Sequence, residues 1–335
     1  MSIKVEKLPR QFIWRRLHSL FGLWIVIFLI EHLLTNSQAA LLVGENGAGF
    51  IRAVNFIKNL PYLPVIEIVL LGVPILLHMV WGIRVLMTSK MNTLSSSGER
   101  PALKKYGRNH AYSWQRITSW ILLLGIIAHV GFMRFYMYPT VVDLGEKSNY
   151  FVRVSMDPGL YTVADRLGVK LYDQEAVITL KHEMDSQTPQ MRGVFERVES
   201  IQESLPPYQY EDSNRELMAR YQHWEYQQAY LKGLEARTLS KGEVIAEAPD
   251  FGTATLLIVR DSFKSVFKAI LYTIFVLAAV FHGFNGLWSF MISWGIVLKM
   301  RTQSKALNCC MGIMVVVGFL GLASIWGTYF INLRN

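Results

Sequence analysis

The chain has 335 residues, of which 52% are hydrophobic and only 18% are charged, and its mean hydropathy is +0.25. This composition excludes an ordinary soluble domain of this size, which carries more charge, and it indicates a membrane protein. The formal net charge of +9 is unevenly distributed, so it reports membrane topology and predicts no nucleic-acid partner.

Five apolar segments are long enough to cross a bilayer, because about 20 residues at a rise of about 1.5 Å each span about 30 Å of hydrocarbon. They are Leu17–Leu34, Val65–Met87, Trp120–Tyr138, Val266–Leu298 and Leu307–Ile331. The sequence therefore predicts an all-α transmembrane protein built as a five-helix bundle. The first segment follows Arg15 and Arg16 without a small-residue cleavage site, so we interpret it as an anchor rather than a signal peptide.

Basic residues predict the orientation of the helices. Lys and Arg crowd three stretches, residues 4–16, 84–116 and 299–305. By the positive-inside rule these stretches, including the N-terminus, lie in the cytoplasm. With five spans, the C-terminus and the connection between the third and fourth spans are then extracytoplasmic.

That connection differs in charge from the rest of the chain. Residues 139–261 hold 13 Lys/Arg and 20 Asp/Glu, whereas the remaining residues hold 21 and 5. We therefore predict three parts: membrane helices 1–3 over residues 1–138, an acidic extracytoplasmic insert over residues 139–262, and membrane helices 4 and 5 over residues 263–335.

The insert is predicted to be a small, mainly helical domain. The Thr-Pro pair at 188–189 indicates a helix start, and the Pro-Pro pair at 206–207 indicates its end. One apolar face of this helix holds Met191, Val194, Phe195, Val198 and Ile201. "SNRE" at Ser213–Glu216 has capping-box spacing before a second stripe. That stripe holds Leu217, Tyr221, Trp224, Leu231 and Leu234. Val244–Ala246 and Thr253–Val259 look like short β-strands.

Four of the eight histidines lie within predicted spans, one in each of the first four: His32, His78, His129 and His282. Polar groups inside a membrane are energetically costly and tend to mark function. A single such histidine is more often structural. One on each of four helices favours paired ligation, because a b-type haem needs two axial imidazoles and an apolar slot between helices.

Depth along the helices predicts how these histidines pair. His32 lies 16 residues beyond Arg16, and His129 lies five residues before an arginine on its outer side, so both lie toward the outer face and could share one haem. His78 lies six residues before an arginine on its cytoplasmic side. His282 is near mid-depth by counting, and by elimination it pairs with His78 at an inner haem.

Six fragments resemble a known family in the same order, one set per helix: "RRLHSLFGLW", "FLIEHLLTN", "LHMVWG", "WQRITS", "AHVGFMR" and "FHGFNGLWSFMISWGI". The family is the five-helix, di-haem cytochrome b membrane-anchor subunit of succinate:quinone oxidoreductases, which comprise succinate dehydrogenase and fumarate reductase. The resemblance covers roughly 200 residues of the membrane part and leaves the insert unmatched.

The resemblance implies two haem b groups, with His32 and His129 as axial ligands of the outer haem and His78 and His282 as those of the inner one. It implies a bacterial inner (cytoplasmic) membrane, flavoprotein and iron–sulfur subunits on the cytoplasmic side, and electron transfer through the haems to a quinone, commonly menaquinone. The chain lacks an iron–sulfur cysteine pattern and a dinucleotide fingerprint, so succinate oxidation belongs to other chains and no catalytic residue is assigned. A higher oligomer of the complex is left open.

Haem propionates are anionic and need hydrogen-bond donors at the membrane surface. Five residues at the cytoplasmic ends of helices one and three would suit the inner haem: Arg16, His18, Ser19, Gln115 and Arg116. For the two arginines, the positive-inside signal is an alternative explanation.

Quinone reduction consumes protons as well as electrons, so its site should hold a titratable group. Glu67 precedes His78 by 11 residues, about three turns, and lies on the same face near the outer interface. Arg134 is a second quinone candidate, with snorkelling to the interface as its alternative role. Glu31, next to His32, is a third.

Two other functions fit parts of the sequence. The chain could be the di-haem, quinone-reactive cytochrome b subunit of a formate dehydrogenase or hydrogenase, families that differ in helix count and histidine placement. It could also be a non-redox membrane scaffold or transporter whose histidines are structural, which predicts no haem.

Overall fold

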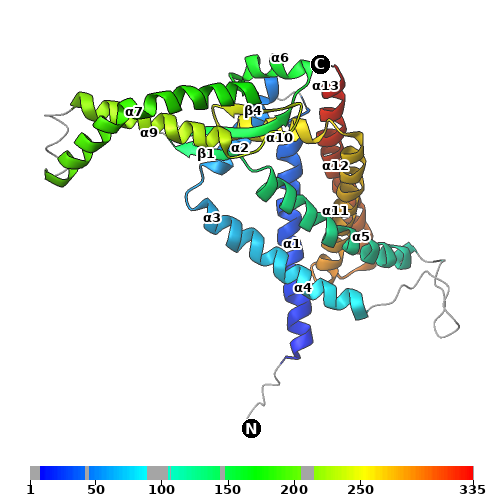
Figure 1. Ribbon diagram of the computed structural model, residues 1–335. Helices are drawn as coiled ribbons and strands as arrows, with labels where there is room; N and C mark the ends of the chain where they lie inside the picture. Colours follow the sequence, from blue (N-terminus) through cyan, green and yellow to red (C-terminus); the bar gives the residue numbers. More distant parts are fainter. Residues whose placement is uncertain are drawn as a thin grey trace, which may run out of the picture. The chain divides into compact units, whose positions relative to one another are not determined.

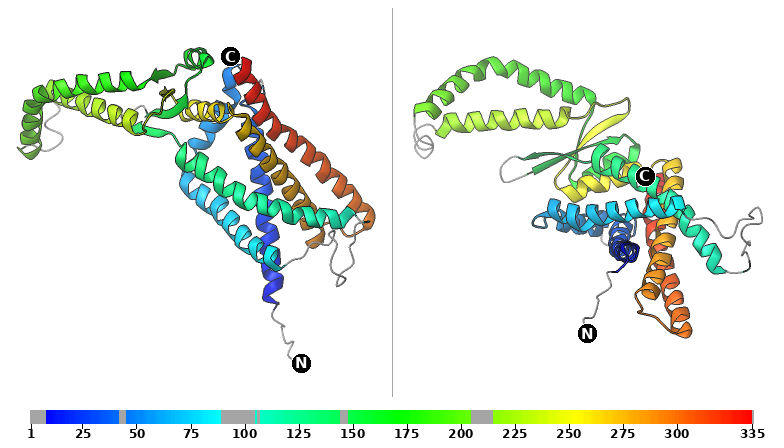
Figure 2. Two further views of the ribbon diagram at one scale, coloured as in Figure 1. Left: turned by 45° about the vertical axis from the view of Figure 1, so that its right-hand side comes forward. Right: turned by 90° about the horizontal axis from the view of Figure 1, so that it is seen from below.

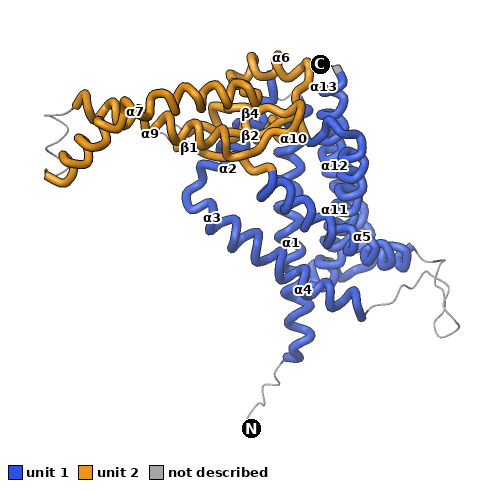
Figure 3. Tube along the Cα trace, in the orientation of Figure 1, with its two compact units in different colours: residues 1–136, 262–334 blue, residues 137–261, 335 orange. Residues whose placement is uncertain are grey.

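The computed structural model describes residues 8–41, 45–88, 105, 107–143, 148–204 and 215–334. The chain divides into two compact units, Met1–Tyr136 with Ser262–Arg334, and Met137–Asp261 (Figure 3). The first unit contains the apolar helices, and the second contains the acidic insert.

Five helices of the first unit are long and apolar enough to cross a membrane, which confirms the five predicted spans (Figure 1). They are α1 (Arg10–Ser37), α3–η2–α4 (Leu63–Ile66, Glu67–Gly72 and Val73–Thr88), α5–η3 (Gly107–Val130 and Gly131–Tyr136), α11 (Val266–Ser293) and α12–η4–α13 (Met300–Leu322, Ala323–Gly327 and Thr328–Arg334). A 3₁₀ turn, η1 (Glu45–Gly47), and a short helix, α2 (Ala48–Lys58), follow α1. The fourth span ends at Ser293 rather than Leu298, because Gly295 adopts a left-handed φ of 72° that ends the helix.

Three of the spans contain π-helical segments: η2, η3 and η4. Segment η2 ends two residues before Pro74, which has no N–H to donate to the carbonyl of Leu70. The indole Nε1 of Trp24 on α1 donates to that carbonyl instead. The hydrogen bond that proline removes is thus replaced by a contact between two spans, as membrane helices require.

Small residues allow the spans to approach closely. An added Cβ at Gly321 would lie 2.6 Å from Val276 of α11 and 3.3 Å from Leu33 of α1. Contacts this close let backbones pack tightly, which matters in a bilayer because helix association there depends on van der Waals contact. Helices α1, α11 and α12 therefore form one packed group.

The second unit contains an antiparallel sheet of four strands in the order β1-β2-β4-β3. The strands are β1 (Thr140–Asp143), β2 (Ser148–Ser155), β3 (Lys170–Tyr172) and β4 (Glu243–Ala248). Strand β4 confirms the predicted strand at Val244–Ala246, whereas β1, β2 and β3 were not predicted. Helices α6 (Pro158–Leu167) and α10 (Phe251–Ser262) are joined at their ends by Arg260, which donates two hydrogen bonds of 2.8 Å to Asp157.

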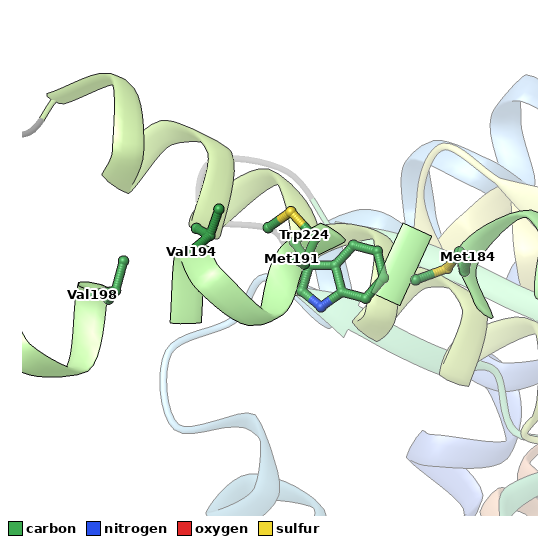
Figure 4. Packing of buried hydrophobic residues seen from close by; sticks show 5 residues of the cluster. All are labelled: Met184, Met191, Val194, Val198 and Trp224. Carbon is green, nitrogen blue, oxygen red and sulfur yellow. The ribbon is translucent and has the colours of Figure 1, made fainter. Parts of the chain in front are cut away.

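Two long helices, α7 (Gln174–Ser204) and α9 (Arg215–Glu235), pack side by side in the second unit (Figure 2). Their shared core contains Met184, Met191, Val194 and Val198 from α7 and Trp224 from α9 (Figure 4). Each such side chain contributes roughly 1.5–3 kcal/mol when fully buried. At Gly233 an added Cβ would lie 2.6 Å from Val142, so the absence of a side chain lets α9 contact β1.

Two predictions for the insert were wrong. Helix α7 does not begin at residues 188–189 but continues through Pro189, and the Thr188 hydroxyl donates to the Met184 carbonyl of the preceding turn. Residues Thr253–Val259 are helical, within α10, because Asp250 accepts hydrogen bonds from the backbone N–H and the hydroxyl of Thr253 and so caps the helix. The Pro-Pro pair at 206–207, Ser213 and Asn214 lie outside the described residues.

Candidate functional site

Four intramembrane histidines form two pairs. The rings of His32 (α1) and His129 (α5) have centroids 5.9 Å apart and planes at 81°. The rings of His78 (α4) and His282 (α11) have centroids 6.3 Å apart, also at 81°. Each pair thus joins two helices that are distant in sequence, and in both pairs the ring planes are nearly perpendicular.

This spacing fits two imidazoles bound to opposite sides of one iron ion. A metal–imidazole bond is about 2 Å long and each nitrogen lies about 1 Å from its ring centre, so the two centroids would lie about 6 Å apart. Both pairs meet this condition. The residues therefore suit bis-histidine ligation of a haem at each pair.

Hydrogen bonds at Nδ1 determine which ring nitrogen is available for a metal. His78 Nδ1 lies 3.0 Å from the backbone carbonyl oxygen of His18. A carbonyl oxygen only accepts, so Nδ1 carries the proton and Nε2 keeps the lone pair that iron requires. The tautomer of His78 thus fits a haem ligand.

The same argument applies to His282. Its Nδ1 lies 3.3 Å from the Thr118 hydroxyl and 3.4 Å from the Ser119 hydroxyl, both on α5. Those hydroxyls already donate to backbone carbonyls of α5, so their oxygens are acceptors toward His282. Nε2 of His282 is again the nitrogen that a metal would bind.

His129 is held by a phenol instead. Its Nδ1 lies 3.0 Å from the Tyr272 hydroxyl on α11, and the two rings meet edge to face with centroids 5.7 Å apart. Tyr272 precedes His282 by ten residues, which is about 15 Å along the helix axis. Helix α11 thus carries one histidine of the His78–His282 pair and contacts a histidine of the His32–His129 pair.

Three of the predicted propionate residues lie on α1 near the inner pair. The His18 ring stacks on the His78 ring at 3.9 Å, and its Nδ1 is buried without a hydrogen-bond partner among the described residues. Ser19 accepts a 2.9 Å hydrogen bond from the indole of Trp294, and Arg16 donates to the Ser293 carbonyl at the end of α11. The unsatisfied His18 nitrogen leaves a hydrogen-bonding position for an additional polar group.

The other two predicted propionate residues lie on α5. Gln115 donates to the His282 carbonyl over 3.1 Å and accepts a 2.7 Å hydrogen bond from Asn285. Arg116 donates to the Tyr112 carbonyl of its own helix over 2.8 Å. Gln115 therefore belongs to the surroundings of His282, whereas this hydrogen bond of Arg116 stays within α5.

Two of the three quinone candidates are in contact. Arg134 Nη2 donates to Glu67 Oε2 over 2.9 Å, and the two side chains are 44% and 38% exposed. Each lies in a π-helical segment, η3 and η2 respectively. Glu31 accepts a 2.9 Å hydrogen bond from Thr35 one turn along α1. The structure thus joins Glu67 with Arg134 and records a separate contact for Glu31.

Two glycines allow close packing beside the histidines. An added Cβ at Gly22 would lie 3.0 Å from Cε1 of the His78 ring. At Gly125 it would overlap the ring of Phe275, which itself lies 5.8 Å from the His129 ring, centroid to centroid. Glycine at these positions therefore lets α1 approach His78 and α5 approach Phe275.

Sequence reasoning missed Tyr272, Thr118 and Ser119 as supporting residues. The one signal in the sequence is helical spacing, since Thr118 and Ser119 precede His129 by about three turns and Tyr272 precedes His282 by about the same. That spacing does not indicate which histidine each residue contacts.

Comparisons with known proteins give one informative similarity. The chain is 36% identical over 122 residues to the succinate dehydrogenase cytochrome b558 subunit of Bacillus subtilis (strain 168). The match covers 36% of this chain and 54% of that subunit, so the chain spans about half the length of the curated relative it matches. No family model matches the chain, and no solved structure does. The chain is therefore a multi-pass membrane protein with sequence similarity to a cytochrome b subunit of succinate dehydrogenase.

Proposed function

We propose that this chain is the di-haem cytochrome b membrane anchor of a succinate dehydrogenase or fumarate reductase, relaying electrons between an iron–sulfur subunit and a quinone, with menaquinone the expected quinone. One observation carries the proposal: two histidine pairs on four apolar helices, with ring centroids 5.9 and 6.3 Å apart. The similarity to a succinate dehydrogenase subunit favours this complex over a formate dehydrogenase, a hydrogenase or a scaffold.

In this proposal His32 and His129 hold one haem, and His78 and His282 hold the other. Each bound haem supplies one-electron chemistry, accepting and releasing an electron at its iron. The chain's own contribution is to hold four imidazoles inside an apolar bundle that excludes water, and to fix the tautomer of three of them, His78, His129 and His282. The carbonyl of His18 and the hydroxyl groups at 118, 119 and 272 do this by accepting hydrogen bonds from Nδ1.

Polar residues around the inner pair would bind the haem propionates. The unsatisfied Nδ1 of His18 and the amide of Gln115 lie beside that pair, with Arg16 and Ser19 at the adjoining helix end. Glu67 and Arg134, joined by an ion pair, would orient the quinone and pass it a proton.

The proposal includes an orientation. The basic clusters put the N-terminus in the cytoplasm, where flavoprotein and iron–sulfur subunits would dock, and the insert at 139–262 and the C-terminus outside. Succinate or fumarate chemistry would take place on the flavoprotein, in either direction.

Purification of the protein in mild detergent, with its partners, tests the proposal. We expect reduced b-type absorption, two haems per chain, and co-purification of a flavoprotein and an iron–sulfur protein. Absence of haem would overturn the proposal, and a molybdenum or nickel partner would transfer the chain to the formate dehydrogenase or hydrogenase class.

Histidine variants test the pairing. His32→Ala or His129→Ala should each remove the same single haem, and His78→Ala or His282→Ala should remove the other. If any one of these changes removes both haems from a protein that still inserts into the membrane, the pairing is wrong. His110→Ala is a matched control, because His110 lies near the start of α5, about two turns before Thr118, and should leave both haems in place.

A further inference from the structure

Tyr272 lies against one histidine of the outer pair in a fixed position. Its hydroxyl is 3.0 Å from His129 Nδ1. Its ring is enclosed by Phe263, with centroids 5.3 Å apart at 85°, and by Phe275, with centroids 6.2 Å apart at 87°. Edge-to-face contacts on two sides restrict rotation of the phenol, so its oxygen is held in place to meet the imidazole.

The two histidines of the outer pair differ in their support. The neighbour of the His32 ring is Phe28, an aromatic ring with its centroid 5.3 Å away, and the described residues show no hydrogen bond to a ring nitrogen of His32. Among the described residues, the hydrogen bond to a ring nitrogen of this pair is therefore the one at His129. Tyr272 is the side chain that makes it.

We propose that Tyr272 is a positioning residue that sets the reduction potential and the retention of the haem held by His32 and His129. This inference rests on the proposed function, because it requires His129 to be an axial ligand. With Nε2 on the iron, Nδ1 carries the proton and donates to the Tyr272 oxygen. That hydrogen bond fixes the plane of the imidazole and increases its electron donation to the iron.

Greater electron donation from the ligand stabilises the ferric state over the ferrous state. Tyr272 therefore lowers the potential of this haem. Its effect is confined to one site, because the inner pair has its own acceptors on different residues: the His18 carbonyl for His78, and the Thr118 and Ser119 hydroxyls for His282.

Tyr272→Phe is the direct test, since it removes one oxygen and keeps the ring. In the purified complex we expect two haems still bound, an upward shift in the potential of one of them, and an altered low-spin electron paramagnetic resonance signal for that haem alone. Transfer of that haem to apomyoglobin should become roughly tenfold faster, because loss of a hydrogen bond to a metal-ligating histidine typically weakens metal binding by about 10–100-fold. Ser119→Ala with Thr118→Val should shift the other haem instead.

Single-haem backgrounds assign the effect to one site. In His78→Ala, which retains the haem of the outer pair, Tyr272→Phe should produce the full shift, and in His32→Ala it should produce none. Tyr329→Phe, a change at a span tyrosine whose ring contacts are Trp326 and Phe330, should leave both potentials unchanged.

Unchanged potentials and transfer rates in Tyr272→Phe, or equal shifts in both haems, would overturn the role of Tyr272 while leaving the proposed function intact. A wild-type complex without haem would instead overturn the proposed function. If Tyr272→Phe inserts poorly, the haem-transfer rate of the folded fraction still decides between the two outcomes.

Discussion

Arg134 and Glu67 form a 2.9 Å ion pair that joins the π-helical segment after His129 to the π-helical segment before Pro74. Two ionisable groups are thus placed together within two predominantly apolar spans. We expect Glu67→Gln to reduce quinone turnover at least about tenfold, because a positioned proton donor typically contributes that much or more. Both haems should remain reducible by dithionite, and steady-state assays with a menaquinone analogue provide the measurement.

The double variant Glu67→Gln with Arg134→Gln tests whether the pair acts as a unit. If it does, quinone turnover by the double variant should be no slower than turnover by either single variant. Glu31→Gln is the matched comparison, because Glu31 is a span glutamate next to His32 whose partner is Thr35 on its own helix. A larger loss in Glu31→Gln than in Glu67→Gln would assign the proton donor to Glu31 instead.

Gly22 provides a selective test of the inner histidine pair. A methyl group at this position would lie 3.0 Å from Cε1 of His78, so Gly22→Ala should displace that ring by a few tenths of an ångström. We expect the haem of the His78 pair to dissociate faster while the other haem is retained. Gly312→Ala, where an added Cβ meets open space, is the control. Equal retention of both haems in Gly22→Ala would contradict the close approach of α1 to His78.

Trp24 and Pro74 should be energetically coupled. Trp24 donates to the Leu70 carbonyl that Pro74 leaves without its helical donor, so Trp24→Phe should lower stability in detergent by about 0.6–1.7 kcal/mol. In a Pro74→Ala background the restored N–H replaces the indole donor, and the loss from Trp24→Phe should shrink. Thermal unfolding of the four proteins of this double-mutant cycle gives the coupling. Additive losses would show that the two residues act independently.

Tyr230 should stabilise the insert through a buried carboxylate. Its hydroxyl donates over 2.6 Å to Glu247, which is 7% exposed and also accepts from Asn149. Tyr230→Phe removes one donor to a buried charge, so we expect a loss of about 1–3 kcal/mol. Limited proteolysis of the insert in the intact chain measures it. Tyr161→Phe, at a tyrosine that is 62% exposed, should have little effect.

The same tyrosine predicts a dependence on alkaline pH. Burial, followed by the hydrogen bond to Glu247, raises the pKa of Tyr230 above its ordinary value of about 10. The folded insert holds this proton more tightly than the unfolded chain does. The associated stability is complete below pH of about 10 and is lost as the pH rises above it. Wild type should therefore lose protease resistance above pH 10 more steeply than Tyr230→Phe; parallel profiles would refute this.

Much of the membrane part could be predicted from the sequence because hydropathy directly reflects the solvent in which a helix lies. The five spans and the placement of one histidine on each of four helices required only counting. The residues that hold the histidines could not be found this way. Tyr272 is 143 residues from His129, and Thr118 is 164 residues from His282, so only the packed helices bring them together.

The insert was harder to predict because its local signals conflict. Thr253 and Val259 are β-branched and favour a strand, yet Ala254, Leu257 and Ile258 are buried at helical spacing. Capping by Asp250 and burial of that face determine the outcome. At Pro189 a local signal that favours a helix boundary is overridden by packing. The contacts of α7 with α9 outweigh the hydrogen bond that proline removes, so the helix continues.

The π-helical segment η3 has a consequence for how such proteins diverge. A π turn contains one residue more than an α turn, so it arises and disappears through single-residue insertions and deletions. Loss of one residue between His129 and Arg134 would leave the histidine on its face of α5 and rotate the arginine by about 100° around the helix axis, away from Glu67. Evolution can therefore redirect the cation without disturbing the imidazole, by changing the length of the chain instead of the identity of either residue.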